Sequence, residues 1–268
     1  MTASTSTPIA ADRVAFPTHW AKRAVWLVFA LYVAYAISTL DITAERFVRG
    51  LDQGAKFLAR MWPPNIQPSK LELLREGMLE SLQIAFISTF AGVLLSIPLG
   101  LLSARNLMPL WASWIGRTII ALCRSFHSLI VVILFVKAVG FGALAGVLAL
   151  VLGSMGFVSK LFAEAIEEMN LKQVEAVRAS GASFLQVLTF GVMPQVLPRF
   201  IGFSAYQLDS NLRNSTMVGI VGGGGIGSTL FTAYQRFDYD FVLTILLVII
   251  ALVIVSEFIT GRMRRLFQ

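Results

Sequence analysis

The sequence predicts an all-α membrane protein with six transmembrane helices, and two observations carry that prediction. The 268 residues are 56% hydrophobic and only 14% charged, with a mean hydropathy of +0.75, whereas soluble domains carry about 25% charged residues. Several apolar runs also approach the length of about 20 residues that a helix needs to cross a bilayer. So few charges suit a surface that lies mostly in lipid.

The spans are placed from the apolar runs and the breaks between them. Residues 1–20 begin with Ser, Thr, Ala and Pro and are interpreted as a loose tail, and residues 21–268 form the membrane domain. The glycines of Gly140-Phe141-Gly142 leave room only for a tight turn, and a more polar segment over 163–198 ends in two prolines. We expect the six spans at 24–40, 79–103, 111–139, 143–162, 199–218 and 241–260.

The distribution of charge predicts the orientation of these spans. The side that holds the N-terminus carries 12 basic and 5 acidic residues, and the other side carries 8 of each. Lys and Arg are enriched on the cytoplasmic side of membrane proteins. Because six spans return the chain to its starting side, we expect both termini in the cytoplasm.

Several classes of chemistry lack their motifs. The single cysteine, Cys123, allows no internal disulfide, and CxxC, HExxH and Walker GxxxxGK[ST] patterns are absent. We therefore expect no metal site and no nucleotide hydrolysis by the P-loop route. An intramembrane enzyme using His127 with a serine lacks a GxSxG motif and an acid/base pair, so no catalytic residue is assigned.

The polar segment over 163–198 predicts two helices joined by a glycine. Residues 161–180 favour one helix that stops at Gly181, and the capping-box spacing of Ser183 and Gln186 predicts that a helix restarts there. An ordinary cytoplasmic connector would have this pattern too. The order of residues within 163–198 is more specific: Glu175-Ala176-Val177, then Gly181 six residues after the Glu, then Val192-Met193-Pro194.

This order resembles the EAA loop of ABC importer permeases, which has Glu-Ala-Ala, a glycine six residues after the Glu, and a hydrophobic-x-Leu-Pro ending. Val177 and Met193 depart from the family's Ala and Leu, and Gly191 stands where the family usually has Ile. The resemblance implies that the segment is a coupling element that docks on a separate ATPase subunit. The residues that it assigns to coupling are Glu175, Ala176, Arg178, Gly181 and Pro194.

A second polar group, Tyr206–Thr216, interrupts an apolar span. Arg213 lies about 22 Å along the helix from Pro198, and a charge at such depth usually faces the bundle interior or a wet path. Asp209 and Arg213 are four residues apart and can pair on one face. A structural ion pair and a stripe lining a translocation path both remain open. The path residues expected here are Asp209, Asn211, Arg213, Ser215 and Thr216.

A glycine-rich loop follows this span at Gly222, Gly223, Gly224, Gly225 and Gly227. Nucleotide binding is a poor interpretation because no strand precedes the glycines. A plain flexible loop remains open, as does a gating loop whose non-helical backbone lines a cavity. Together with Ser215–Val221, the glycines resemble the end of span five in the methionine-permease-like fold. The alternation of Asp209, Asn211 and Arg213 is most similar to the phosphonate-permease branch.

A further similarity lies at Arg124-Ser125-Phe126-His127, where many relatives have Arg-Ser-Ile-Pro. His127 replaces the proline, so the sequence leaves open whether the helix bends here. Arg124 would either extend to the headgroups or, with His127, provide positive potential for an anion in the path.

The resemblance covers roughly residues 70–265. It implies a methionine-permease-like fold and a homodimer in the bacterial cytoplasmic membrane, with the path at the dimer interface. Its expected partners are two ABC ATPase subunits that hold ATP and Mg, and an extracytoplasmic solute-binding protein. It implies no cofactor in this chain and no nucleic acid. The expected function is import of phosphonate, phosphite or a phosphate ester by alternating access. The alternatives are a methionine or glycine betaine permease, and a gated channel with Gly222–Gly227 as its filter.

Overall fold

The computed structural model describes residues 19–40 and 43–267, and over these residues the chain is helical without β-strands. The all-α fold class is therefore confirmed. Residues 1–18 of the predicted tail lie outside the described residues. The elements in chain order are α1 (His19–Thr39), α2 (Ala44–Met61), α3 (Pro68–Ser103), α4 (Leu110–Ser125), α5 (Ser128–Val139), α6 (Ala143–Glu167), α7 (Leu171–Ala179), α8 (Phe184–Gln186), η1 (Val187–Val192), α9 (Met193–Val218), η2 (Gly219–Gly223), α10 (Ile226–Gln235) and α11 (Tyr239–Phe267); η1 and η2 are π-helical.

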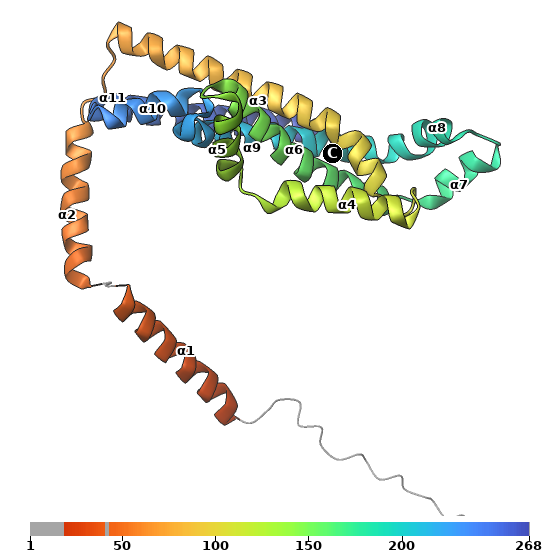
Figure 1. The fold of residues 1–268 in the computed structure, drawn as a ribbon, viewed down its shortest axis with the longest axis horizontal. Coiled ribbons are helices and arrows are strands. Elements are labelled where there is room, and N and C mark those ends of the chain that lie inside the picture. Colours follow the sequence, from red (N-terminus) through yellow and green to blue (C-terminus); the bar gives the residue numbers. More distant parts are fainter. Residues whose placement is uncertain (1–18, 41–42, 268) are drawn as a thin grey trace, which may run out of the picture. The chain divides into compact units, whose positions relative to one another are not determined.

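The chain divides into two compact units, Met1–Ala59 and Arg60–Gln268. In the first unit α1 is apolar, whereas α2 has one apolar and one charged side. The second unit is a helical bundle in which α3 runs along the length and α7 and α8 project from one end (Figure 1).

Four helical stretches of the described chain are by themselves long and apolar enough to cross a membrane, and the number rises to six when each of two bent helix pairs counts as one span. One pair is α1 and α2, which meet at 57°. The other is α4 and α5, which meet at 89°. The predicted third span, 111–139, is thus two helices with a sharp bend at Phe126 and His127.

The predicted single helix over 161–180 is wrong. The helix α6 ends at Glu167, and α7 begins after Asn170, whose side-chain oxygen accepts a hydrogen bond from the Lys172 amide at 3.1 Å. Asparagine side chains compete with helical hydrogen bonds and favour N-cap positions, which separates the two helices here.

The bundle is built on the close approach of α3 and α6. Along α3, small residues recur every four positions at Ser88, Gly92, Ser96 and Gly100, and all are buried. An added Cβ on Gly92 would lie 2.4 Å from the Ser154 Cβ of α6. Small residues let membrane helices pack backbone to backbone, so this face of α3 is committed to α6, which also contacts α4, α5 and α9.

Candidate coupling and translocation sites

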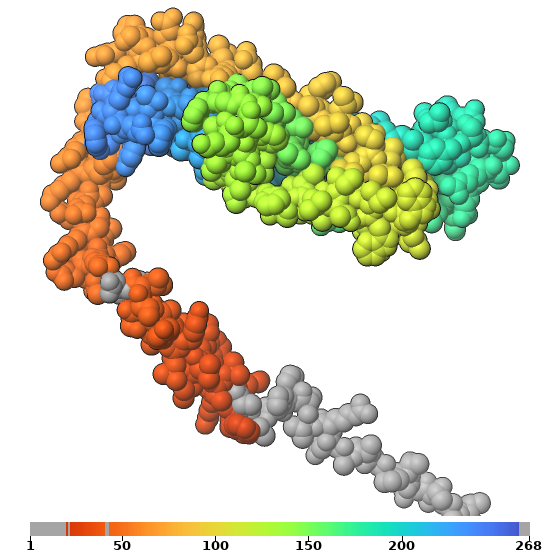
Figure 2. Space-filling view, in the orientation of Figure 1, coloured from red at the N-terminus to blue at the C-terminus, as the bar shows by residue number. Residues whose placement is uncertain are grey.

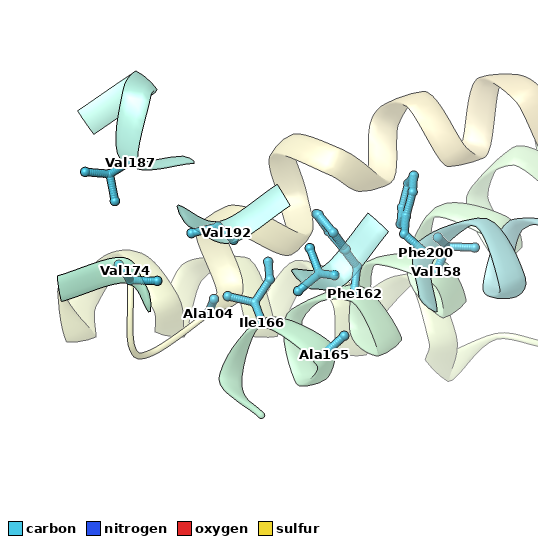
Figure 3. Close-up of a cluster of buried hydrophobic side chains, with 10 residues drawn as sticks. Ala104, Val158, Phe162, Ala165, Ile166, Val174, Val187, Val192 and Phe200 are labelled. Atoms are coloured by element: carbon cyan, nitrogen blue, oxygen red, sulfur yellow. The ribbon is translucent and has the colours of Figure 1, made fainter. Parts of the chain in front are cut away.

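The helix α7 packs on the bundle through the buried Val174 and the half-buried Val177. Val174 is only 2% exposed and packs with Val187, Val192 and Ile166 in a buried cluster (Figure 3). On the other sides of α7, Glu175, Ala176 and Arg178 are exposed. Figure 2 shows the α7–α8 segment protruding at the end of the bundle. These three predicted coupling residues therefore lie on a surface that another protein can reach.

The turn after α7 has the predicted geometry. Gly181 adopts φ +79°, a conformation that favours glycine, and its amide donates to the Arg178 carbonyl at 3.0 Å. The capping box is confirmed, because the Ser183 amide donates to Gln186 Oε1 at 2.8 Å and the reciprocal bond is present. Pro194 lies in the first turn of α9, directly after the π-helical η1.

The glycine that departs from the family pattern has a packing role. A Cβ on Gly191 would lie 3.3 Å from the Val174 Cα, so the small residue allows α7 to lie directly against η1. Gln195 strengthens the same junction, since its side-chain oxygen accepts from the Asn170 amide at 3.1 Å and its nitrogen donates to the Gly191 carbonyl at 2.7 Å. The coupling segment is thus continuous with α9 through a tightly packed joint.

An ion pair with unequal exposure lies in the middle of α9. Asp209 Oδ2 and Arg213 Nη2 are 2.7 Å apart, with 3% of the Asp209 side chain and 42% of the Arg213 side chain exposed. Ser256 of α11 donates to the other carboxylate oxygen at 2.9 Å. The predicted Asp209–Arg213 pair is therefore present. The buried Asp209 carboxylate positions the Arg213 guanidinium, which is partly exposed on the outside of the bundle.

Asn211 is the centre of a buried amide network. Its Nδ2 donates to Thr89 Oγ1 of α3 at 2.9 Å and to Ser154 Oγ of α6 at 2.8 Å. Its Oδ1 accepts from Gln207 Nε2 at 3.0 Å, and Gln207 also donates to Ser154. The network joins α3, α6 and α9. Sequence analysis missed Gln207, Thr89 and Ser154, although two amides four residues apart in an apolar helix are a usable sign.

The polar residues of α9 fall on two opposite faces. Successive helical residues rotate by about 100°, so residues two apart point to nearly opposite sides. Tyr206, Arg213 and Met217 are exposed on one face, while Asn211 and Ser215 are buried on the other. The predicted path residues therefore do not share one surface. Arg213 reaches the outside and Thr216 is half-buried.

The glycine-rich segment is closely packed backbone. A Cβ on Gly227 would lie 1.9 Å from the Thr216 carbonyl oxygen, and one on Gly219 would lie 2.3 Å from the Gly224 oxygen. The expectation of a plain flexible loop is therefore wrong, because these positions have no room for a side chain. Three of the predicted gating glycines also have positive φ: Gly222, Gly224 and Gly225.

A carboxylate that sequence analysis did not single out holds this segment. Glu80 of α3 accepts a hydrogen bond from the Gly225 amide at 2.8 Å, and Ser81 Oγ accepts from the Ile226 amide at 2.8 Å. The first turn of α10 is thus attached to α3 by two adjacent side chains. The glycines of this segment pack against α3, α5 and α9. They are Gly222, Gly223, Gly224, Gly225 and Gly227.

The bend at His127 forms without proline. The imidazole Nδ1 accepts a hydrogen bond from the Leu129 amide at 3.3 Å and caps α5, and the side chain is exposed. Arg124, at the end of α4, is also exposed, and its stem lies against Gly156 of α6. Among the residues that the structure describes, neither side chain forms a hydrogen bond or an ion pair with Asp209 or Arg213.

Within residues 19–40 and 43–267, no group of three His, Cys, Asp or Glu side chains is placed to hold a metal ion.

Comparison with known proteins identifies relatives of one kind. A family model described as "Binding-protein-dependent transport system inner membrane component" matches residues 96–268. The chain is 37% identical over 239 residues to the phosphite transport system permease protein PtxC of Stutzerimonas stutzeri, covering 89% of this chain and 86% of that protein. It is 39% identical over 206 residues to the phosphate-import permease protein PhnE of Mycolicibacterium smegmatis, of which this chain covers only 38%.

A solved structure has the same architecture. The chain aligns with a chain of the inward-facing MetNI methionine ABC transporter with a TM-score of 0.67 and 26% identity, covering 76% of this chain and all of that one. The methionine-permease-like fold expected from the resemblance is therefore confirmed.

Proposed function

From the premise that this chain belongs to the family of binding-protein-dependent transport system inner membrane components, we propose that it carries a phosphonate, phosphite or related phosphorus oxyanion across the membrane. It is a multi-pass inner-membrane permease of an ABC transporter and a transport component, not an enzyme. A permease of this type works with an ATPase and a binding protein.

The observation that carries the substrate class is the exposed guanidinium of Arg213. The side chain is positioned by the buried Asp209 carboxylate, and it lies in a helix that is otherwise apolar enough to span the membrane. Guanidinium groups match oxyanions with parallel hydrogen bonds. The relatives named for phosphite and phosphate import support the same class. Thr216 completes the proposed path, whereas Asn211 and Ser215 support it from inside the bundle.

Coupling is assigned to the exposed side of α7. Glu175, Ala176 and Arg178 would contact the ATPase, Gly181 would permit the turn, and Pro194 would begin the helix that leads to Arg213. ATP and Mg would be bound by the partner ATPase. Since α7 joins α9 through the packed joint at Gly191, movement of the ATPases would be transmitted to the path as alternating access.

A second membrane subunit is needed to cover Arg213. The face with Tyr206, Arg213 and Met217 is exposed in the single chain, and a guanidinium facing hydrocarbon is costly. We propose that a second copy of this chain packs against this face. In both copies the two termini and α7 would lie in the cytoplasm. Co-expression of two differently tagged copies tests this assignment. Recovery of both tags in one complex supports a homodimer, and recovery of only one tag beside a different permease contradicts it.

The experiment that tests the transport function is ATPase activity of the assembled transporter in nanodiscs, with its binding protein and candidate solutes. We expect phosphonate or phosphite to stimulate hydrolysis and Glu175→Ala to abolish the stimulation. Glu72→Ala, an exposed acid on α3, is the matched control and should leave it intact. Stimulation by methionine or betaine alone would refute the substrate class, and solute flux without an ATPase would refute the importer.

The channel alternative has no observation in its favour. A glycine filter needs backbone that faces an open path, whereas Gly223, Gly224, Gly225 and Gly227 are buried against neighbouring backbone and side chains.

A further inference from the structure

A hollow between α3, α4 and α6 is lined by more cations than anions. It has a volume of about 180 Å³, and its charged lining consists of Arg117, Arg124, Lys160 and Glu164. Water-sized groups need roughly 10–15 Å³ of such space each, so a tetrahedral oxyanion fits with solvent beside it.

The charges of the hollow form two levels. At the first level Arg117 of α4 is neutralised by Glu167 of α6, with Nη2 at 2.7 and 2.9 Å from the two carboxylate oxygens, and its Nε donates to the Ser103 carbonyl at 3.2 Å. Arg124 follows Arg117 by seven residues and Lys160 precedes Glu167 by seven residues. Seven residues correspond to about 10 Å in a helix, so both cations lie at a second level, farther from the end of α6 that leads to α7.

At the second level, the two cations Arg124 and Lys160 face only one carboxylate in the lining of the hollow, that of Glu164. Glu164 lies 3.5 Å from Lys160, while Arg124 has no ion pair within the part of the chain that the structure describes. Gly156 fixes this arrangement, because a Cβ there would lie 2.9 Å from the Arg124 Cγ. The arginine stem thus lies on α6 one helical turn from Lys160, and both side chains line the hollow. Like charges at one level of a membrane protein destabilise each other unless an anion lies between them.

We propose that this hollow binds a tetrahedral phosphorus oxyanion between Arg124 and Lys160. Two sources supply that chemistry, namely a transported solute on its way through the protein and the headgroup of an anionic phospholipid. The solute source rests on the proposed function, but the anion site itself does not. Arg117 and Glu167 act as positioning residues that hold α4 and α6 together at the rim.

Direct binding measurements on the complete transporter test this site. The variant is Arg124→Gln with Lys160→Gln, and the control is Arg75→Gln with Lys137→Gln, two exposed cations elsewhere that remove the same charge. In one arm, native mass spectrometry counts phosphatidylglycerol retained from a defined mixture. In the other, calorimetric titration in phosphatidylcholine nanodiscs measures binding of inorganic phosphate and methylphosphonate. We expect the variant to bind the anion of one arm at least about tenfold more weakly, and the control to match the natural protein.

Weaker retention of phosphatidylglycerol by the variant would identify a lipid headgroup as the bound anion, and weaker binding of phosphate or methylphosphonate would identify a transported solute. Equal binding by variant and natural protein in both arms, or no binding by the natural protein in either, would overturn the proposal. The conservative variant Arg124→Lys with Lys160→Arg keeps both charges and should keep binding, which separates loss of the site from loss of folding. Transport by the natural protein is measured separately, so failure here leaves the importer function standing.

A second inference rests on α2 and is independent of the hollow. Five of the six charged residues of α2 fall within an arc of about 80° at 100° per residue, and Arg46 lies at the edge of this side. The five are Glu45, Arg49, Asp52, Lys56 and Arg60. The opposite side carries Phe47, Leu51 and Leu58, which are 68%, 61% and 65% exposed. Two ion pairs, Glu45–Arg49 and Asp52–Lys56, run along the charged side.

The position of α2 between two membrane helices indicates that lipid covers its apolar side. It begins five residues after α1 ends, and α3 begins seven residues after α2 ends. Connections this short keep both ends within about 25 Å of membrane helices. The helix has four basic and two acidic residues, and helices with a charged side rich in Lys and Arg lie in the membrane surface. We infer that α2 lies in the bilayer interface, with Phe47, Leu51 and Leu58 among the lipid chains.

Spin-label accessibility in phosphatidylglycerol-containing nanodiscs tests this placement. In a Cys123→Ser background, Leu51→Cys and Asp52→Cys place labels on opposite sides of α2. We expect the Leu51 label to be relaxed by oxygen, which partitions into lipid, and the Asp52 label by a water-soluble nickel chelate. Relaxation of both labels by nickel would show α2 in water, and shielding of the Leu51 label from both reagents would show a protein cover. Either result contradicts the inference.

Discussion

Among single residues, the unequal exposure of Asp209 and Arg213 has the clearest energetic meaning. The carboxylate is buried and receives hydrogen bonds from Ser256 and Arg213. Removing one partner of such a pair leaves an uncompensated charge, which costs more than removing both. The pair is therefore both a structural element and the support of the exposed guanidinium.

This pair predicts opposite results for stability and transport. Asp209→Asn should lower the unfolding free energy by about 1–2 kcal/mol, because Arg213 loses its counter-charge but remains partly exposed. Asp209→Asn with Arg213→Gln should recover the melting temperature in detergent and remain inactive in transport. Full transport by the double variant would show that Arg213 has no role in the path.

Asn211 gives a second residue-scale prediction. Asn211→Leu removes hydrogen bonds to Thr89, Ser154 and Gln207, and we expect a loss of about 1 kcal/mol of stability. Gln83→Leu, an exposed amide on α3, is the control and should leave the melting temperature unchanged. An unchanged melting temperature in Asn211→Leu would show that the network is not stabilising.

Among the elements, the junction of α9, η2 and α10 is the most constrained. The α9 and α10 backbones cross at glycines, and Glu80 and Ser81 fix the start of α10. A break in a spanning helix is tolerated where neighbouring protein satisfies the freed backbone groups, and here α3 does so.

Two glycines of this region should respond oppositely to alanine. Gly227→Ala forces a Cβ against the Thr216 carbonyl, so we expect a loss of about 1–3 kcal/mol. Gly202→Ala lies in α9 with nothing within 4 Å of the new Cβ and should gain up to about 1 kcal/mol from helix propensity. Thermal unfolding of both variants measures the contrast, and equal melting temperatures would contradict the packing described here.

Elements that depend on local sequence could be predicted. The turn at 140–142, the capping box at Ser183 and the Asp209–Arg213 pair each involve residues within four positions. The bend between α4 and α5 could not be predicted, since the proline that usually marks it is absent and His127 caps α5 instead. The break after Glu167 depends on Asn170, whose capping role competes with an otherwise helical pattern.

For the whole molecule, the path from α7 to Arg213 is one connected body. Val174 fixes α7 to the cluster shared by α6, η1 and α9, and α9 continues to the ion pair. The partners across this body are remote in sequence, which is why sequence analysis placed Glu175 and Arg213 in separate sites but could not show what joins them.

This connection predicts uncoupling by a small cavity. Val174→Ala should reduce solute transported per ATP hydrolysed by several-fold, because α7 can move without moving α9. Leu79→Ala, an exposed apolar residue of α3, is the control and should leave the ratio unchanged. Transport and hydrolysis measured in the same proteoliposomes give the ratio, and an unchanged ratio in Val174→Ala would argue against rigid transmission.

The crowded glycines have a consequence for mutation in a living cell. Every single-nucleotide change that alters the amino acid of a glycine codon adds a side chain or ends the protein, so Gly219, Gly223, Gly225 and Gly227 have no mild neighbours in the genetic code. When cells are selected for resistance to a toxic analogue that enters through this transporter, escape mutations should collect at these codons. Codons for the open positions Gly50, Gly54 and Gly202 should remain largely untouched.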